Sequence, residues 1–412
     1  MQESCAHVIV AGHICLDVIP DMENHGVDVA DLFAPGKLVD VGAAVLATGG
    51  AVSNTGLALH RLGVPTRLLG KVGADLFGRA VLDLINDYAP MLADNMIVRN
   101  GEQTSYSIVI NPPGVDRIFL HCPGANDTFC ADDVPLKQIS GSRLFHFGYP
   151  PLMRRMYEDG GVELSTLLQH AKACGATTSL DMASPDPVSA AGMVDWQTFL
   201  RRVLPHVDVF LPSVEEILFM LDKEYLAYLK RTEAGIAPKL NGAVLHEITQ
   251  QLLQLGAAIV GLKLGDQGLY VRTTGMASRL SAMGGAMANV DERWLDRELL
   301  APCFAVDVVG TTGAGDCTIA GFLAALLHDL SPEEVLTRAV AVGACNVEAA
   351  DATSGVPTWG KVEQRIASGW ERRSVELDLP GWIWAAESSI WCGPHDSDLG
   401  QTRTLANHDM EC

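Results

Sequence analysis

The chain of 412 residues lacks several features that would indicate a function class directly. Its ten cysteines run from Cys5 to Cys412 without a C-x-x-C pair, which argues against a zinc ribbon or a thioredoxin-like redox site. No apolar run approaches the roughly 18 residues of a membrane span. The first such run, residues 7–19, is interrupted by His13 and Asp17, unlike a secretory signal. We therefore expect a cytoplasmic protein with free thiols.

Basic residues are also scarce. Fifty acidic residues against 29 basic ones give a formal charge of −21. A surface this negative repels nucleic acid and anionic membranes, so we expect neither as a partner. It still allows a phosphorylated ligand, because oriented backbone N–H groups or a metal ion bind anions locally.

Three common site motifs are missing. The chain has no G-x-x-x-x-G-K-[ST], which excludes a P-loop enzyme, and no G-x-G-x-x-G, which weakens a dinucleotide-binding interpretation. The segment HEITQ at 246–250 lacks the second histidine of a zinc-protease helix, so we interpret it as surface.

Short apolar strands alternate with helical patterns through most of the chain, and this predicts an α/β fold with a parallel sheet covered by helices on both faces. Ligands of such sheets bind beyond the carboxyl ends of the strands. The predicted strands lie at 7–12, 66–73, 143–148, 176–181, 207–212 and 257–265, and helix-like segments lie between them at 54–62, 76–88, 162–174 and 243–255.

Two stretches, 14–48 and 95–121, break this alternation. The first has no helical period, and the second has two strand-like runs around PPGVD, which predicts a β-hairpin. Together they predict a small β-sheet lid. The predicted division is an α/β domain at 1–13, 49–94 and 122–368, the lid at 14–48 and 95–121, and a C-terminal extension at 369–412.

Three further segments look like additions to the α/β domain. Residues 221–241 are charged and predicted to be helical, and residues 275–302 are predicted to form a loop. The C-terminal extension carries Trp382, Trp384 and Trp391, so we expect it to pack on its own domain or on a partner chain.

The segment GTTGAGD at 310–316 precedes the apolar run 317–327. Small residues at Gly313, Ala314 and Gly315 leave the N–H groups of a first helical turn uncovered, and the helix dipole adds positive charge, which favours an anion site. Asp316 then lies beside the anion, where a carboxylate can accept a proton from an attacking hydroxyl. The alternative is a capping turn in which Asp316 only stabilises the dipole.

Two other groups of residues are candidates for contacts with a ligand. Gly49 and Gly50 allow close backbone approach, and Asn54 offers both a donor and an acceptor at the start of a helix. Asp17, just past the first strand, is able to accept hydrogen bonds from two hydroxyls of a polyol. The alternatives are a glycine turn with an Asn cap and an exposed loop aspartate.

Taken together, these segments resemble the ribokinase-like (PfkB) carbohydrate kinases from about residue 7 to residue 357. The resemblance includes GHICLD, the GG…N segment followed by RLG, GKVGADLFG, DRIFLHCPGAN, the SLD that ends at Asp181, LPSVEEI, GLKLGDQGLYV and TTGAGD, in the family's order. It implies a ribokinase-like fold and ATP-dependent phosphorylation of a sugar hydroxyl.

The resemblance also implies residue roles. Asp316 is the general base, the amides of Gly313, Ala314 and Gly315 form the anion hole, and the sugar hydroxyls are held by Asp17, Gly49, Gly50 and Asn54. Lys263, Gly265 and Gly268 belong to the nucleotide loop, the residues around Asn346 approach the adenine, and Glu216 acts near Mg²⁺.

Two positions depart from the family pattern. Gly310 replaces an aspartate that helps to bind a monovalent cation in some members, which puts potassium activation in question. Ser213 replaces an asparagine, and Ser213 with Glu216 is also a capping box for the helix that follows.

For the acceptor we favour a neutral sugar or polyol, because the matched positions are Asp, Gly, Gly and Asn rather than basic residues. A nucleoside is the alternative, with Phe33, Tyr106 and Phe119 in the predicted lid as a wall for the base. A non-catalytic sugar- or nucleotide-binding protein on the same scaffold is a further alternative. Family lids often pair, so we expect a homodimer.

Overall fold

The computed structural model describes residues 7–397, apart from 23–33, 113–116, 232–235 and 237–238. A ten-stranded sheet forms its centre, with six strands parallel to one another and the remaining strands antiparallel at one edge. In spatial order the strands are β15 (Ile383–Ala385), β16 (Ile390–Cys392), β14 (Glu298–Ala301), β13 (Leu269–Thr273), β12 (Ile259–Lys263), β11 (Val209–Phe210), β10 (Thr177–Leu180), β9 (Leu144–Gly148), β1 (Val8–Gly12) and β4 (Thr66–Leu69).

Strand β1 shows why the sheet is covered on both faces. All five of its residues are buried, and successive side chains of a strand point to opposite faces. Accordingly Val8 and Val10 belong to one hydrophobic core, and Ile9 and Ala11 belong to another on the opposite face. This near-continuous apolar run is typical of a parallel strand.

Helices line both faces of the sheet, as the strand–helix alternation predicts. One core includes residues of α2 (Ala51–Arg61), α3 (Leu76–Tyr88), α12 (Ala314–Leu327), α13 (Pro332–Asn346) and α14 (Trp359–Ala367). The other core includes residues of α5 (Arg154–Tyr157), α6 (Val162–Ala173), α7 (Trp196–Val203), α8 (Val214–Leu221), α9 (Lys223–Leu229) and α10 (Gly242–Gln254). The short helices α4 (Leu136–Ile139) and α11 (Ala277–Ser281) each add one residue to a core, Ile139 to the second and Leu280 to the first. Among the described residues, no helix combines the length and apolar character needed to cross a bilayer.

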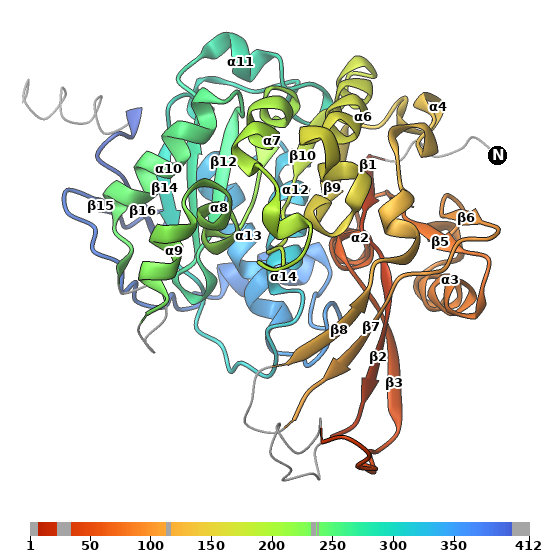
Figure 1. The fold of residues 1–412 in the computed structure, drawn as a ribbon. Helices are drawn as coiled ribbons and strands as arrows, with labels where there is room; N and C mark the ends of the chain where they lie inside the picture. The colour runs from red at the N-terminus through yellow and green to blue at the C-terminus, as the bar shows by residue number, and fades with distance from the viewer. Residues whose placement is uncertain (1–6, 23–33, 113–116, 232–235, 237–238, 398–412) are drawn as a thin grey trace, which may run out of the picture.

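A four-stranded sheet projects from the main body (Figure 1). Its order is β3 (Ala44–Gly49), β2 (Cys15–Pro20), β7 (Tyr106–Ile110) and β8 (Ile118–Cys122). We call this sheet the lid. Strand β6 (Ile97–Arg99), inside the range predicted for the lid, pairs instead with β5 (Lys71–Gly73), so the lid begins later than residue 95. The predicted hairpin turn at 113–116 and the lid residues 23–33 lie outside the described residues.

The C-terminal extension is part of the main sheet rather than an appendage. Strand β16 pairs with β14, β15 pairs with β16, and Trp382 is buried with its ring 5.8 Å from that of Tyr270. We expected this apolar segment to pack on its own domain or on a partner chain, and in the structure it packs on its own domain. The segment 275–302 is not simply the loop that we predicted, because it contains α11 and β14.

Candidate functional site

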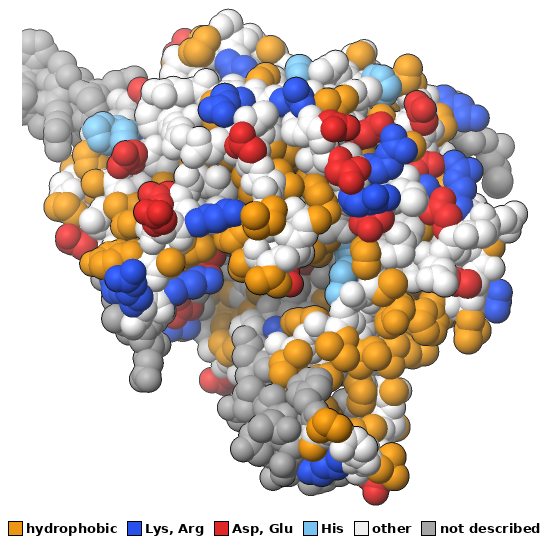
Figure 2. Space-filling view, viewed as in Figure 1, with side chains coloured by type: hydrophobic (Ala, Val, Ile, Leu, Met, Phe, Trp, Pro, Cys, Tyr) orange, Lys and Arg blue, Asp and Glu red, His pale blue; other side chains and the backbone are white. Residues whose placement is uncertain are grey.

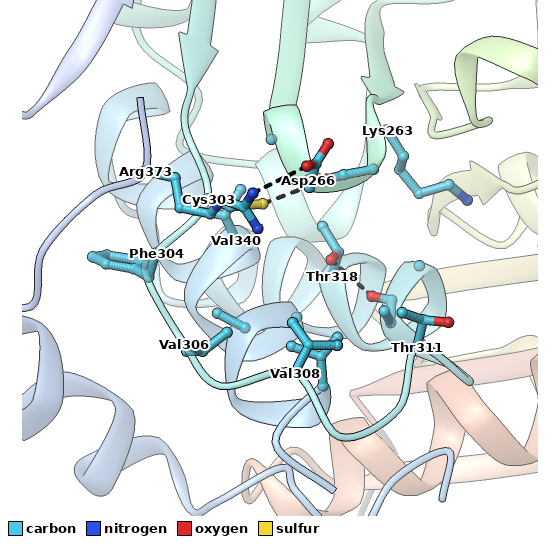
Figure 3. A pocket seen from close by; sticks show the side chains of 17 residues that line it. Lys263, Asp266, Cys303, Phe304, Val306, Val308, Thr311, Thr318, Val340 and Arg373 are labelled. Carbon is cyan, nitrogen blue, oxygen red and sulfur yellow. Dashed lines mark hydrogen bonds and ion pairs between the residues drawn. The ribbon is translucent and has the colours of Figure 1, made fainter. Parts of the chain in front are cut away.

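Two cavities meet at the start of α12, and Thr311 lines both of them. The larger, of about 880 Å³, lies between the lid and the carboxyl ends of β1 and β9, and we call it the acceptor cavity. The smaller, of about 310 Å³, extends along α12 and α13 (Figure 3), and we call it the apolar cavity. The GTTGAGD segment therefore separates two chemically different spaces.

Asp316, in the first turn of α12, lines the acceptor cavity with a carboxylate that is almost completely buried. The Asn54 side-chain amide donates to Oδ2 over 2.9 Å, and the Tyr149 hydroxyl donates to the same oxygen over 2.7 Å. The Thr55 hydroxyl donates to Oδ1 over 3.4 Å. Three side chains thus fix the orientation of the carboxylate toward the cavity.

Burial raises the pKa of Asp316 above the ordinary aspartate value. The hydrogen bonds from Asn54 and Tyr149, followed by the charge of Lys263, oppose that rise. The carboxylate is consequently a stronger proton acceptor than an exposed aspartate, while its partners keep the ionised form accessible. Such an environment is common for general bases.

The other predicted acceptor residues are brought to the same cavity. Asp17, Gly49, Gly50 and Asn54 all line it. Gly50 has φ 92°, and a Cβ there would lie 2.5 Å from Nδ1 of His13, so only glycine fits this position without strain. Asn54 donates to Asp316, which adds positioning of the carboxylate to the role expected for it.

A chain of polar side chains links Asp17 to the main domain across the lid. Cys15 Sγ donates to Asp17 Oδ1 over 3.3 Å, and Ser107 also hydrogen-bonds this carboxylate. Ser107 lies 3.0 Å from Nδ1 of His121, whose Nε2 is 3.4 Å from Nε2 of His13. Burial lowers the pKa of His13 to about 3, with a further contribution from His121. Burial also lowers the pKa of His121, so both imidazoles are neutral near pH 7.

Tyr149, Thr55 and His121 were not predicted from the sequence. Tyr149 directly follows β9, at the carboxyl edge where ligands of parallel sheets bind, and this position was an available signal. Its backbone is left-handed, with φ 63°, which is uncommon for a tyrosine. This conformation is not predictable from the sequence. Thr55 and His121 carry no local sequence signal.

The predicted nucleotide residues lie around the apolar cavity. Lys263, Gly265, Gly268, Ala314 and Gly315 all line it, whereas Gly313 lines the acceptor cavity. We expected the Ala314 amide to be uncovered, but its N–H donates to the Thr311 carbonyl over 3.3 Å.

Asn346 differs from its expected placement. It is fully buried, it does not line either cavity, and its Nδ2 donates to the Thr312 carbonyl over 2.8 Å. Gly343 and Ala344 of α13, and Val347 just after it, line the apolar cavity instead. Residues around Asn346 therefore reach this space, while Asn346 itself braces the GTTGAGD segment.

Lys263 and two acidic residues form a charged cluster next to Gly315. Lys263 Nζ lies 2.6 Å from Oδ1 of Asp181. Burial raises the pKa of Asp181, and the Lys263 ammonium offsets this only in part. Burial also raises the pKa of Glu216, and its Oε2 accepts from the Ser213 N–H over 2.6 Å. The Ser213–Glu216 capping box is thus present, and the same carboxylate lies within the electrostatic range of Lys263 and Asp316.

The chemistry of this cluster fits a magnesium ion held mainly by water and phosphate. Mg²⁺ commonly takes only one or two protein carboxylates, and Asp181 and Glu216 offer two. Among the described residues, a set of three clustered metal ligands occurs only at His246, Glu298 and His395, none of which lines either cavity. The cavities therefore contain no preformed three-residue cage within the described part of the chain.

The fold is that of ribokinase-like proteins. A structure of a putative ribokinase II from E. coli, in complex with ATP and Mg²⁺, aligns with a TM-score of 0.63 over 88% of this chain and 99% of that chain, at 20% identity. At this identity the likeness shows the fold alone. It confirms the predicted parallel-centred α/β sheet with a separate small sheet.

Sequence comparison goes further than the fold. Residues 6–359 match the model of the pfkB family carbohydrate kinases, and the chain belongs to this family. An uncharacterised sugar kinase of Archaeoglobus fulgidus is 26% identical over 73% of this chain and 98% of its own length. Fructokinase-1 of Zea mays is 25% identical over 87% of this chain and 97% of its own length. The predicted family is confirmed, and the chain is a sugar kinase of that family.

Proposed function

We propose that the protein transfers the γ-phosphoryl group of ATP to a hydroxyl of a neutral sugar, with Asp316 as general base. The acceptor hydroxyl donates its proton to the Asp316 carboxylate as its oxygen attacks the γ-phosphorus. The bond from the γ-phosphorus to the β–γ bridging oxygen breaks, and ADP leaves with that oxygen and its electron pair. Positioning and charge stabilisation carry most of the catalysis in such a transfer.

The observation that carries this proposal is the position of GTTGAGD between the two cavities. Ala314 and Gly315 line the apolar cavity, and Gly313 and Asp316 line the acceptor cavity. A phosphate at the start of α12 would therefore be within reach of both a nucleotide and an acceptor hydroxyl. Backbone amides and the helix dipole favour an anion there.

We assign the apolar cavity to ATP and the charged cluster to the metal. Lys263, Gly265 and Gly268 would contact the phosphates, and Asp181 and Glu216 would hold Mg²⁺ or its waters. The bound ion would neutralise charge on the phosphates. The absent carboxylate at Gly310 means that we assign no monovalent cation.

The acceptor cavity suits a polyol better than a phosphosugar on its main-domain side. Asp17, Asn54 and the neutral pair His13 and His121 offer hydrogen-bond partners to hydroxyl groups without adding positive charge. Arg117 also lines this cavity, but its guanidinium donates to the Thr312 hydroxyl, beside the expected γ-phosphate. We therefore assign it to the phosphoryl group rather than to the sugar.

A panel of hexoses, pentoses, polyols and nucleosides, each assayed for ADP release, tests this assignment. We expect turnover with a neutral sugar and little release without an acceptor. Turnover confined to phosphosugars would contradict the acceptor class, and a lack of ADP release with every acceptor would favour the non-catalytic alternative.

A nucleoside remains the alternative acceptor because Phe119 lines the cavity. Of the other two aromatic residues proposed as a wall for the base, Tyr106 packs edge-on against Phe77, with centroids 5.2 Å apart, and Phe33 lies outside the described residues. Of the three aromatic residues, the described part of the lid thus offers only Phe119 as a wall for a base. This favours a sugar over a nucleoside as the acceptor.

A further inference from the structure

The C-terminal segment 370–376 forms a wall beside the apolar cavity and enters its lining through Arg373. It lies beyond residues 6–359, which match the family model. The Arg373 N–H donates to the Cys303 carbonyl over 2.8 Å, and the Glu371 carbonyl accepts from the Ala305 N–H over 2.9 Å. The Glu376 N–H donates to the Gln267 side chain over 2.7 Å. The segment is therefore tied both to residues 303–305, which follow β14, and to the nucleotide loop.

Aromatic and cationic stacking holds this wall in place. Trp370 stacks on Phe304 with ring centroids 4.3 Å apart and an interplanar angle of 18°. The Arg372 guanidinium lies 3.9 Å from the centroid of the Phe304 ring, and it also donates to the Pro302 carbonyl over 2.8 Å. Stacks of this kind stabilise a segment without ordered secondary structure.

One arginine of the wall enters the cavity lining. Arg373 Nη2 donates to Oδ2 of Asp266 over 3.1 Å, and both side chains line the cavity. In the view of Figure 3, Arg373 and Asp266 lie between Phe304 at one end and Lys263 at the other. The end near Phe304, with Val306 and Val340, is apolar and suits a base, whereas the Lys263 end suits phosphates.

We propose that Asp266, held by Arg373 from the C-terminal segment, binds the ribose hydroxyls of the nucleotide. This inference relies on the assignment of the apolar cavity to ATP. A ribose joins base and phosphates, so it would lie where these two charged side chains meet. A carboxylate oxygen has more than one acceptor site, so Asp266 is able to accept from a hydroxyl while it is paired with Arg373. The arginine orients the carboxylate and maintains its charge.

Equilibrium binding of ATP, 2′-deoxy-ATP and 3′-deoxy-ATP, measured by calorimetry without an acceptor, tests this proposal on the full chain. We expect the wild-type protein to bind ATP about tenfold more tightly than at least one deoxy analogue, because a hydrogen bond to a charged group is lost. Asp266→Asn and Arg373→Ala should each weaken ATP binding about tenfold and abolish that preference.

Arg293→Ala is the matched control, because Arg293 is an exposed arginine in a similar ion pair, 2.8 Å from Asp291, and it lines neither cavity. Arg373→Lys keeps the charge without the guanidinium fork, and it should leave part of the preference intact. Equal losses for ATP and both deoxy analogues, or unchanged binding in Asp266→Asn, would overturn the proposal. The measurement needs no phosphoryl transfer, so the binding affinities can be compared even if the proposed catalysis is wrong.

Discussion

Asp316 carries a negative charge in surroundings that burial makes unfavourable for it. Its raised pKa means that the folded state holds a proton more tightly than the unfolded state does. The free energy of unfolding therefore falls as the pH rises from the pKa of the unfolded state through the pKa of the folded state. Above the folded-state pKa the full cost of the buried charge is present. A protein keeps such a destabilising group where its chemistry is needed.

Asp316→Asn separates this stability cost from catalysis. We expect kcat to fall on the order of a thousandfold, because the proposed general base is lost, while nucleotide binding changes little. The free energy of unfolding in urea should not decrease, because the buried charge is removed. Steady-state kinetics and urea denaturation check both results. Asp83→Asn, on the exposed side of α3, is the control, and a mild loss of kcat would favour a non-catalytic binding protein.

Tyr149→Phe tests the positioning of the carboxylate. The Tyr149 hydroxyl lowers the pKa of Asp316, so its removal should move the acid limb of the kcat profile to higher pH. We also expect kcat at its optimum to fall about tenfold, because one hydrogen bond to a charged group is lost. Tyr228→Phe changes an exposed tyrosine and should leave the profile unchanged. A tyrosine that only packed against α2 and α12 would leave the acid limb in place.

The limits of sequence reasoning are visible among these residues. Asp316 was predicted because the seven consecutive residues GTTGAGD indicate a helix start with exposed amides and a carboxylate beside them. Tyr149 and Thr55 contact the same carboxylate from distant parts of the chain. The position of Tyr149 after a predicted strand places it at the ligand edge of the sheet but does not indicate its partner, and Thr55 carries no such signal. Asn346 was expected to face a nucleotide, but which side of α13 faces the cavity depends on how the helix packs.

At the level of elements, the turn before α12 depends on one glycine. Gly313 has φ 71°, and a Cβ there would lie 2.4 Å from the Ala352 carbonyl oxygen. A left-handed backbone and a clash with backbone both oppose any larger residue. The proposed anion site therefore depends on the shape of this turn as well as on the helix that it opens.

Gly313→Ala should destabilise the protein by more than the backbone conformation alone requires. Gly265 provides the comparison, because its φ is 61° but a Cβ there would meet nothing within 4 Å. We expect Gly265→Ala to cost about 1–2 kcal/mol, the typical cost of this conformation for an L-residue. Gly313→Ala should cost more and should also lower kcat. Equal losses in urea denaturation would show that the turn yields to the added methyl group.

The predicted strands of the parallel half are confirmed, because each is a short buried run between a turn and a helix. The segment 66–73 is the exception: it is divided into β4 and β5, which belong to different sheets. The antiparallel edge was largely not predicted. Strands β14, β15 and β16 are short, and although β15 and β16 are neighbours in the sequence, the pairing of β14 with β16 joins segments that are far apart in it.

On the scale of the whole molecule, the lid has two faces with different chemistry. Asp17 is in register with Ser107, and Ser107 with His121, and this row faces the acceptor cavity. The next row is Leu46, Val18, Ile108 and Leu120, also in register across all four strands. Because successive side chains alternate, this apolar row points away from the site.

This apolar row favours a second copy of the chain as its cover. Leu46 and Leu120 are each 47% exposed, and hydrophobic side chains gather on the lid in Figure 2. Val18, in the middle of the row, packs against the main core, but a thin sheet whose two edge strands expose leucines on one face has reason to pair with a symmetry-related lid. The expected homodimer would then hold the lid over the acceptor cavity without contributing to its polar lining.

Leu120→Lys should convert this dimer into a monomer, because a two-fold contact would place two ammonium groups near each other in an apolar interface. Sedimentation equilibrium across a range of concentrations measures the change. Leu136→Lys is the matched control, since Leu136 is 51% exposed on α4, well away from the lid in Figure 1. A wild-type protein that stays monomeric, or a dimer unaffected by Leu120→Lys, would show that another surface, or none, serves for association. If the dimer supports the lid, the monomeric variant should also show a raised KM for the sugar, because the lid lines the acceptor cavity. Its affinity for ATP should be retained, because no described residue of the lid lines the apolar cavity.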